Sequence, residues 1–155
     1  MELADILHEE SVLYCTGLKT KRDVLEKMAA SAAAAAGQPV DTVFAAIDAR
    51  ESLGSTGLGN GIAIPHGKLP GLHGVTAVFA RLDEPVDFDS VDDQPVDLVV
   101  MLLAPLGSGA DHLKALALVA RILRTEPVVE RLRKATDPRQ LYEVLAQPLT
   151  THQAA

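Results

Sequence analysis

The chain has 155 residues, the length of one domain, with 48% apolar residues and a net charge of −7. This acidic balance argues against nucleic acid as a partner, because binding a phosphate backbone needs a concentrated positive face. No apolar run approaches the ~18 residues that span a bilayer, the N-terminus has no signal-like segment, and the single cysteine, Cys15, cannot form an internal disulfide. We therefore expect a cytoplasmic globular protein, peripheral to a membrane at most.

Two helices are expected in the first third of the chain. A capping box over Thr20–Asp23 predicts a helix that ends near Gly37. Asp41 can cap a second helix through Ala49, which places Arg50 at the end of that helix.

Two strands are predicted in the middle of the chain. Val75–Leu82 is mostly apolar and fits a strand. Pro95–Pro105 carries a continuous apolar stretch bounded by prolines, which predicts a strand buried on both faces.

Three helices are expected in the last third. The longest, capped by Ser108 and Asp111, runs to about Thr125, and two shorter helices cover Pro127–Ala135 and Asp137–Gln147. The apolar spacing predicts that the long helix has an inner face formed by Leu113, Leu116, Ala117, Ala120 and Leu123.

The order of these elements predicts the fold class. Helices, then strands, then helices indicate an α/β or α+β fold with a mixed β-sheet flanked by helices. We expect a single compact domain over residues 1–149 and a disordered tail over residues 150–155.

The segment from Arg50 to Lys68 (RESLGSTGLGNGIAIPHGK) is the most informative part of the sequence. Its glycines can turn backbone N–H groups onto an anion, and His66 is presented between Pro65 and Gly67. Neutral imidazole is a good nucleophile, and Arg50 can hold phosphate oxygens in a bidentate fork. The segment therefore predicts a phosphoryl site with His66 as acceptor. By composition alone, a plain turn histidine and a surface arginine remain alternatives.

Spacing argues against nucleotide, metal and thiol sites. The interval from Gly61 to Gly67 is one residue too long for a Walker A loop, and the glycine order does not fit a dinucleotide fingerprint. There is no zinc motif, and the acidic segment Asp83–Asp93 lacks the glycine and terminal glutamate of a calcium loop. The segment after Cys15 has no arginine at the position where a thiol-phosphatase loop needs one, so we expect Cys15 to pack in the core. We expect no metal and no cofactor.

The other histidines differ in their surroundings. His112 lies in the first turn of its predicted helix, where the helix dipole disfavours an imidazolium, and it could face His66 across a phosphate-sized gap. A surface histidine is the alternative, because sequence spacing alone does not show proximity. We expect His8, His73 and His152 on the surface.

These residues together resemble a known family. Arg50–Glu51, the glycine loop over residues 54–61 and Ile62–Gly67 are similar to the signature of the fructose/mannitol-type IIA component of the bacterial phosphoenolpyruvate:sugar phosphotransferase system. The resemblance covers about Leu7 to Ala146 and is greatest to the nitrogen-regulatory branch of the family. It extends to Gln94–Leu98, to residues 112–117, and to the pairs Leu132-Arg133 and Leu141-Tyr142.

The resemblance implies roles for individual residues. It implies that His66 accepts a phosphoryl group on Nε2 from the phosphohistidine of a small HPr-like carrier, while Arg50 and His112 steady the phosphate. Lys68 would contact either the phosphate or a partner. The resemblance also implies a compact α/β fold and a phosphoryl transfer that needs neither metal nor nucleotide. The phosphate-binding loop would contain Thr56, Gly57, Gly59 and Gly67.

Three functions follow as hypotheses. The first is a regulatory phosphocarrier, a phosphotransferase component that does not turn over a small molecule alone. Its phosphorylation would add about two negative charges and switch its binding to targets, which the resemblance suggests are potassium-transport or sensor-kinase components. The second is a sugar-specific IIA subunit that passes phosphate to a IIB domain. The third is a binding module that is never phosphorylated.

Overall fold

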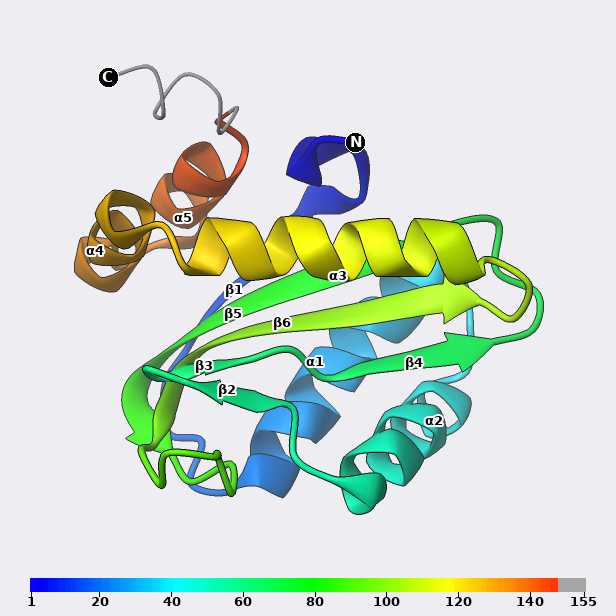
Figure 1. Cartoon of the computed structure of the whole chain (residues 1–155), viewed down its shortest axis with the longest axis horizontal. Coiled ribbons are helices and arrows are strands. Elements are labelled where there is room, and N and C mark those ends of the chain that lie inside the picture. The colour runs from blue at the N-terminus through cyan, green and yellow to red at the C-terminus, as the bar shows by residue number, and fades with distance from the viewer. Residues whose placement is uncertain (148–155) are drawn as a thin grey trace.

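A mixed β-sheet with helices on both of its faces forms the centre of the molecule (Figure 1). The computed structural model describes residues 1–147, so the tail expected over residues 150–155 lies outside the described residues. The strands are β1 (Leu7–Cys15), β2 (Gly57–Gly59), β3 (Ile62–Ala63), β4 (His66–Leu69), β5 (Thr76–Val86) and β6 (Val96–Pro105). The helices are the 3-10 turn η1 (Leu3–Asp5), α1 (Lys21–Ala36), α2 (Val40–Leu53), α3 (Gly109–Leu123), α4 (Glu126–Lys134) and α5 (Pro138–Leu145). The predicted fold class is confirmed.

Strand β6 is central to the sheet. The strand order is β1-β5-β6-β3-β2, and β4 also pairs with β6. Strand β6 is antiparallel to β5 and parallel to β3 and β4. The short strands β3 and β4 therefore follow one another along the same side of β6. This register places His66 opposite Leu102, in the second half of β6.

Each face of the sheet carries its own apolar core. Along β6, Leu98, Val100 and Leu102 belong to one buried cluster, which α3, α4 and α5 complete. The alternate residues Val99 and Met101 belong to the other cluster, together with α1 and α2. Side chains of a strand alternate between faces, so a strand covered on both sides is apolar along its length. The expected two-sided burial is confirmed.

Helix α1 begins and ends where its capping residues predict. The Thr20 side chain accepts a hydrogen bond of 3.0 Å from the Asp23 N–H, and the Asp23 carboxylate accepts one of 3.2 Å from the Thr20 N–H. Gly37 follows the helix in the left-handed conformation, at φ 67°, which glycine adopts at little cost.

Helix α2 differs from the prediction at both ends. It begins at Val40 with Pro39 at the N-cap position, so Asp41 lies inside the first turn instead of capping the helix. It also continues past Ala49 to Leu53, so Arg50 and Glu51 both lie within the helix.

The glycine loop is partly a β-hairpin, which the sequence analysis did not predict. Strands β2 and β3 pair in antiparallel fashion around Asn60-Gly61, whose φ values are 57° and 80°. An Asn-Gly pair that accepts positive φ at both positions is a strong hairpin signal.

Helix α3 turns a different face to the core from the one predicted. Leu113 is 66% exposed and Ala117 is exposed, whereas Leu123 is buried as expected and Leu116 and Ala120 are partly buried. Apolar residues occupy more than one side of this helix, so their spacing fits two orientations. Packing against the sheet selects the other one. The buried residues of α3 are His112, Ala115, Leu118, Val119, Ile122 and Leu123.

The other predicted elements agree with the structure to within a few residues, whereas η1, β1 and β4 were not predicted. Strand β5 begins at Thr76, one residue after the predicted start, and extends past Leu82 to Val86 through an irregular register. Ser108 occupies the N-cap position of α3, but its hydroxyl donates to the Pro105 carbonyl instead of capping the helix. Both short C-terminal helices, α4 and α5, are present.

Candidate functional site

His66 is the first residue of β4 and is half-buried. Its ring Nδ1 lies 2.9 Å from the backbone oxygen of Ile64. A carbonyl oxygen only accepts hydrogen bonds, so this contact assigns the proton of the neutral ring to Nδ1. Nε2 is then left with its lone pair, and it is the nucleophilic atom of the ring.

The ring of His112 lies next to that of His66. The two ring centroids are 5.4 Å apart, and the ring planes are inclined by 51°. His112 is only 6% exposed, so the alternative of a surface histidine is wrong. The first turn of α3 therefore brings the second histidine to the start of β4, as the sequence suggested without being able to show it.

The surroundings of His112 favour its neutral form. Burial lowers its pKa, and the positive charges of His66 and Lys68 lower it further. Its Nδ1 is buried and has no hydrogen-bond partner within residues 1–147. A neutral imidazole beside His66 can offer a hydrogen bond to a group bound there.

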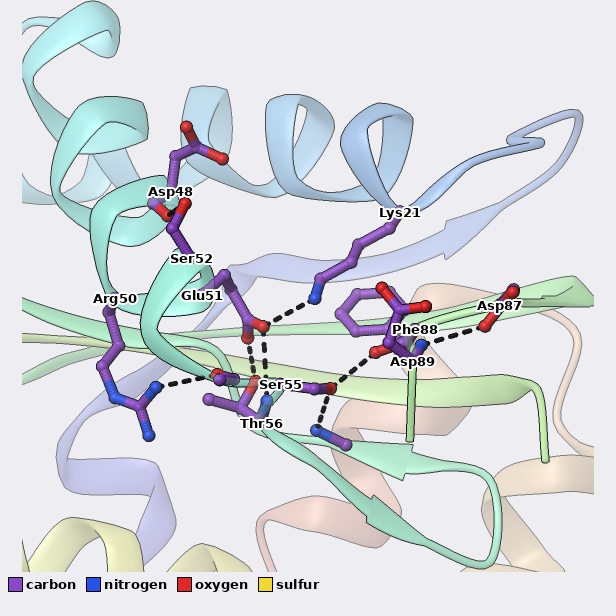
Figure 2. A network of polar contacts seen from close by, with 12 residues as sticks. Lys21, Asp48, Arg50, Glu51, Ser52, Ser55, Thr56, Asp87, Phe88 and Asp89 are labelled. Carbon is purple, nitrogen blue, oxygen red and sulfur yellow. Dashed lines mark hydrogen bonds and ion pairs between the residues drawn. The ribbon is translucent and has the colours of Figure 1, made fainter. Parts of the chain in front are cut away.

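Arg50 lies on the last turns of α2 and is half-buried. One guanidinium nitrogen donates a hydrogen bond of 2.9 Å to the Gly54 carbonyl, as Figure 2 shows. A guanidinium has five N–H donors, so this contact orients the group and leaves donors for an anion.

Close packing of α2 against β4 brings the side of α2 that carries Arg50 toward His66. A Cβ atom added to Gly67 would lie 3.4 Å from the backbone of Ala46 and 3.4 Å from the Ile47 side chain. The helix therefore touches the strand directly beside His66. Arg50 follows Ala46 by one helical turn, on the same side of α2.

The predicted phosphate-loop residues before β4 are occupied by contacts within the protein. The N–H and hydroxyl of buried Thr56 both donate to the Glu51 carboxylate. A Cβ on Gly57 would lie 2.2 Å from the Ser90 hydroxyl oxygen, so only glycine fits there. These contacts fix the start of the hairpin and leave the Thr56 donors already bonded.

Gly59 lies beside a carboxylate. A Cβ on Gly59 would be 3.1 Å from a carboxylate oxygen of Asp92, whose pKa is lowered by hydrogen bonds from the Asn60 N–H and then the Gln94 N–H. An ionised carboxylate at this position would repel a phosphate. The far end of the hairpin is therefore poorly suited to bind an anion.

The sequence analysis included Glu51 in the motif but assigned it no role. Its side chain is buried, and its carboxylate lies 2.8 Å from the Lys21 ammonium group. Lys21 also lies over the ring of Phe88, 5.3 Å from the centroid. These residues come from distant parts of the chain, and no local pattern connects them.

Other expected residues can be placed. His8 and His73 are exposed, as predicted, whereas His152 lies outside the described residues. Cys15 is buried in the core on the α1 and α2 side, and burial raises the pKa of its thiol. Within residues 1–147 no cluster of three or more histidine, cysteine or acidic side chains is placed to hold a metal ion. None of the helices in that part of the chain is long and apolar enough to cross a membrane.

Comparison with known proteins gives consistent results. Residues 5–147 match the family described as "Phosphoenolpyruvate-dependent sugar phosphotransferase system, EIIA 2". The chain is 48% identical over 151 residues to a nitrogen regulatory protein of Bradyrhizobium diazoefficiens, covering 97% of this chain and 99% of the relative. It is also 42% identical over 111 residues to a fructose-specific EIIA component of Haloferax volcanii, covering 70% of this chain and 72% of the relative.

A solved structure agrees with both sequence matches. The crystal structure of nitrogen regulatory protein IIA-Ntr from Neisseria meningitidis superposes with a TM-score of 0.85 at 31% identity, and the alignment covers 92% of this chain and 98% of that chain.

Proposed function

Because the chain belongs to the EIIA 2 family of the phosphoenolpyruvate-dependent sugar phosphotransferase system, we propose that it is a phosphoryl carrier of the nitrogen-regulatory type. His66 accepts a phosphoryl group from the phosphohistidine of an HPr-like carrier, and the phosphorylation state then controls binding to target proteins. The observation that supports this most directly is the hydrogen bond between His66 Nδ1 and the Ile64 oxygen, 2.9 Å long, which leaves Nε2 free.

The transfer requires little covalent chemistry from the protein. The lone pair of His66 Nε2 forms a bond to phosphorus while the nitrogen–phosphorus bond of the donor breaks, and its electron pair returns to the donor ring. His66 keeps its proton on Nδ1, so the phosphorylated ring gains positive charge beside the Ile64 carbonyl, which stabilises it. Such transfers depend mainly on positioning and on stabilisation of charge at the phosphoryl oxygens.

Two neighbouring groups are suited to that stabilisation. Arg50 is oriented by Gly54 and retains N–H donors. His112 stays neutral and lies against His66. No metal or nucleotide is needed, because the phosphohistidine of the donor already carries the transfer potential.

The regulatory function rests on the relatives. Nitrogen regulatory proteins match nearly the whole chain. A IIA subunit for sugar uptake, which passes phosphate to a IIB domain, is the second candidate, because a relative named as a fructose-specific EIIA component also matches. For the regulatory type, the targets proposed are potassium-transport or sensor-kinase components in the cytoplasm.

The test is a transfer assay with radiolabelled phosphoenolpyruvate, enzyme I and HPr-like carriers. Wild type should take up acid-labile label, and His66→Ala should take up none while its circular dichroism spectrum stays unchanged. Arg50→Ala should be labelled more slowly. Preference for a nitrogen-type donor would favour regulation, and preference for a sugar-type donor would favour uptake.

Two results would contradict the proposal. Label retained by His66→Ala would place the phosphoryl group elsewhere. Wild type that stays unlabelled with every competent donor would be a binding module.

A further inference from the structure

Glu51 is a buried carboxylate whose oxygens all have partners. It is 7% exposed, and Oε2 accepts a hydrogen bond of 3.2 Å from the Thr56 N–H and lies 2.8 Å from Lys21 Nζ. Oε1 accepts the hydroxyl hydrogen of Thr56. Burying a carboxylate is costly unless it is paired and hydrogen-bonded, so these contacts hold Glu51, Lys21 and Thr56 together as one unit (Figure 2).

A hydrogen-bonded path connects this unit to His66. The carbonyl oxygen of Thr56 accepts a hydrogen bond of 3.1 Å from the Ile64 N–H. The carbonyl oxygen of Ile64 in turn lies 2.9 Å from Nδ1 of His66. Ile64 follows β3 and precedes β4, in the break between the two strands. The bond to Thr56 therefore orients Ile64, and Ile64 orients the imidazole.

The same turn also orients Arg50, which lies on α2. Gly54, which accepts the guanidinium hydrogen bond, lies between Glu51 and Thr56 in the chain. In Figure 2 Arg50 and Glu51 leave α2 in different directions and contact this turn at different points. Fixing the turn with the Glu51 carboxylate therefore also fixes the acceptor that orients Arg50.

We propose that Glu51, held by Lys21, is a positioning residue for phosphoryl acceptance. Through Thr56 and Ile64 it keeps His66 in the Nδ1–H tautomer, with Nε2 free to attack. This inference rests on the proposed function, because it concerns the same reaction. Glu51 does not touch the phosphoryl group; it sets the geometry of the groups that do.

The test compares Glu51→Gln with wild type. Glutamine has nearly the same shape, but its NH₂ group replaces an acceptor with a donor and it cannot pair with the Lys21 charge. Single-turnover transfer from the phosphorylated HPr-like carrier should slow on the order of tenfold to a hundredfold at saturating donor, the scale expected for small misplacement of reacting groups. The donor concentration for half-maximal rate should stay unchanged.

A second readout reports on His66 itself. Long-range ¹H–¹⁵N spectra distinguish the two imidazole tautomers. Wild type should show the Nδ1–H form, and Glu51→Gln should show a mixture. Glu26→Gln is the matched control, because Glu26 pairs with Arg22 at 3.1 Å on the exposed surface of α1. It should leave both the rate and the tautomer unchanged.

Each outcome decides the question. Unchanged rate and tautomer in Glu51→Gln, even with a lower melting temperature, would overturn the inference and leave Glu51 a structural residue. If Glu51→Gln does not fold, Thr56→Val removes only the hydroxyl contact, and the same two readouts apply to it. If wild type is not phosphorylated, the proposed function fails, and the tautomer spectra still show whether Glu51 positions His66.

Discussion

At His112, burial and neighbouring charge act on the same imidazole. The ring is enclosed at the first turn of α3, and its Nδ1 has no hydrogen-bond partner in the described part of the chain. Burial is the largest cause of its lowered pKa, followed by the charges of His66 and Lys68. The folded protein therefore takes up a proton at His112 only at a lower pH than the unfolded chain does.

This difference predicts a pH dependence of stability. The free energy of unfolding should fall as the pH drops below the ordinary histidine pKa of 6.5, because the unfolded chain then binds a proton that folded His112 does not. His112→Gln should remove this contribution. Urea unfolding at intervals between about pH 5 and pH 8 measures it.

Two carboxyl groups with shifted pKa values affect the free energy of unfolding in a different pH range. The pKa values of Asp23 and Asp92 are lowered from 3.8, so their contributions are lost at more acidic pH. The difference between wild type and His112→Gln therefore isolates the histidine. Parallel stability curves for the two proteins would contradict the prediction.

At the scale of elements, helix boundaries follow local chemistry where a capping group is present. The capping box at α1 satisfies backbone donors at both Thr20 and Asp23. The hydrogen bond from the Lys19 N–H is the main reason that the pKa of Asp23 is lowered, so the box is intact at neutral pH. At α4 the N-cap residue is Thr125, whose side chain makes no capping hydrogen bond.

The two threonines therefore provide a matched comparison. Thr20→Ala should lower the free energy of unfolding by about 1 kcal/mol, because an N-terminal donor of α1 loses its acceptor. Thr125→Ala loses only an exposed hydrogen bond from its hydroxyl to the Arg121 carbonyl, so it should cost about 0.5 kcal/mol or less. Urea denaturation of both variants checks this, and equal losses would show that the α1 cap has no special effect.

At the scale of the whole molecule, β6 joins the two apolar cores. Met101 and Leu102 are adjacent and fully buried, but they belong to opposite clusters. The helices on the two faces of the sheet therefore pack on the same strands, because β5 also contributes to both clusters through Phe79 and Val78 (Figure 1). Neither core can lose its packing without affecting the strand that the other core needs.

Truncation on either face should therefore destabilise the entire fold. Met101→Ala and Leu102→Ala should each cost about 2–5 kcal/mol, in one cooperative transition. Exposed Leu113→Ala is the control and should change the free energy of unfolding by less than about 0.5 kcal/mol. A two-step transition in either core variant would indicate that the two faces unfold independently.

The sequence by itself determined the features that depend on neighbouring residues. The capping box of Thr20 and Asp23, the apolar strand Val96–Pro105 and the motif around His66 all lie within short segments. Asn60-Gly61 is also a local signal, and the hairpin could have been predicted from it.

Only the tertiary structure decided which distant residues meet. The pairing of Lys21 with Glu51 and the contact of His66 with His112 depend on the strand order and on how α1, α2 and α3 pack on the sheet. The buried face of α3 was decided in the same way, because its apolar residues fit two orientations until the sheet selects one. A local sequence pattern indicates periodicity and turn type. Contacts between distant residues depend instead on how the whole chain buries its apolar surface in one fold.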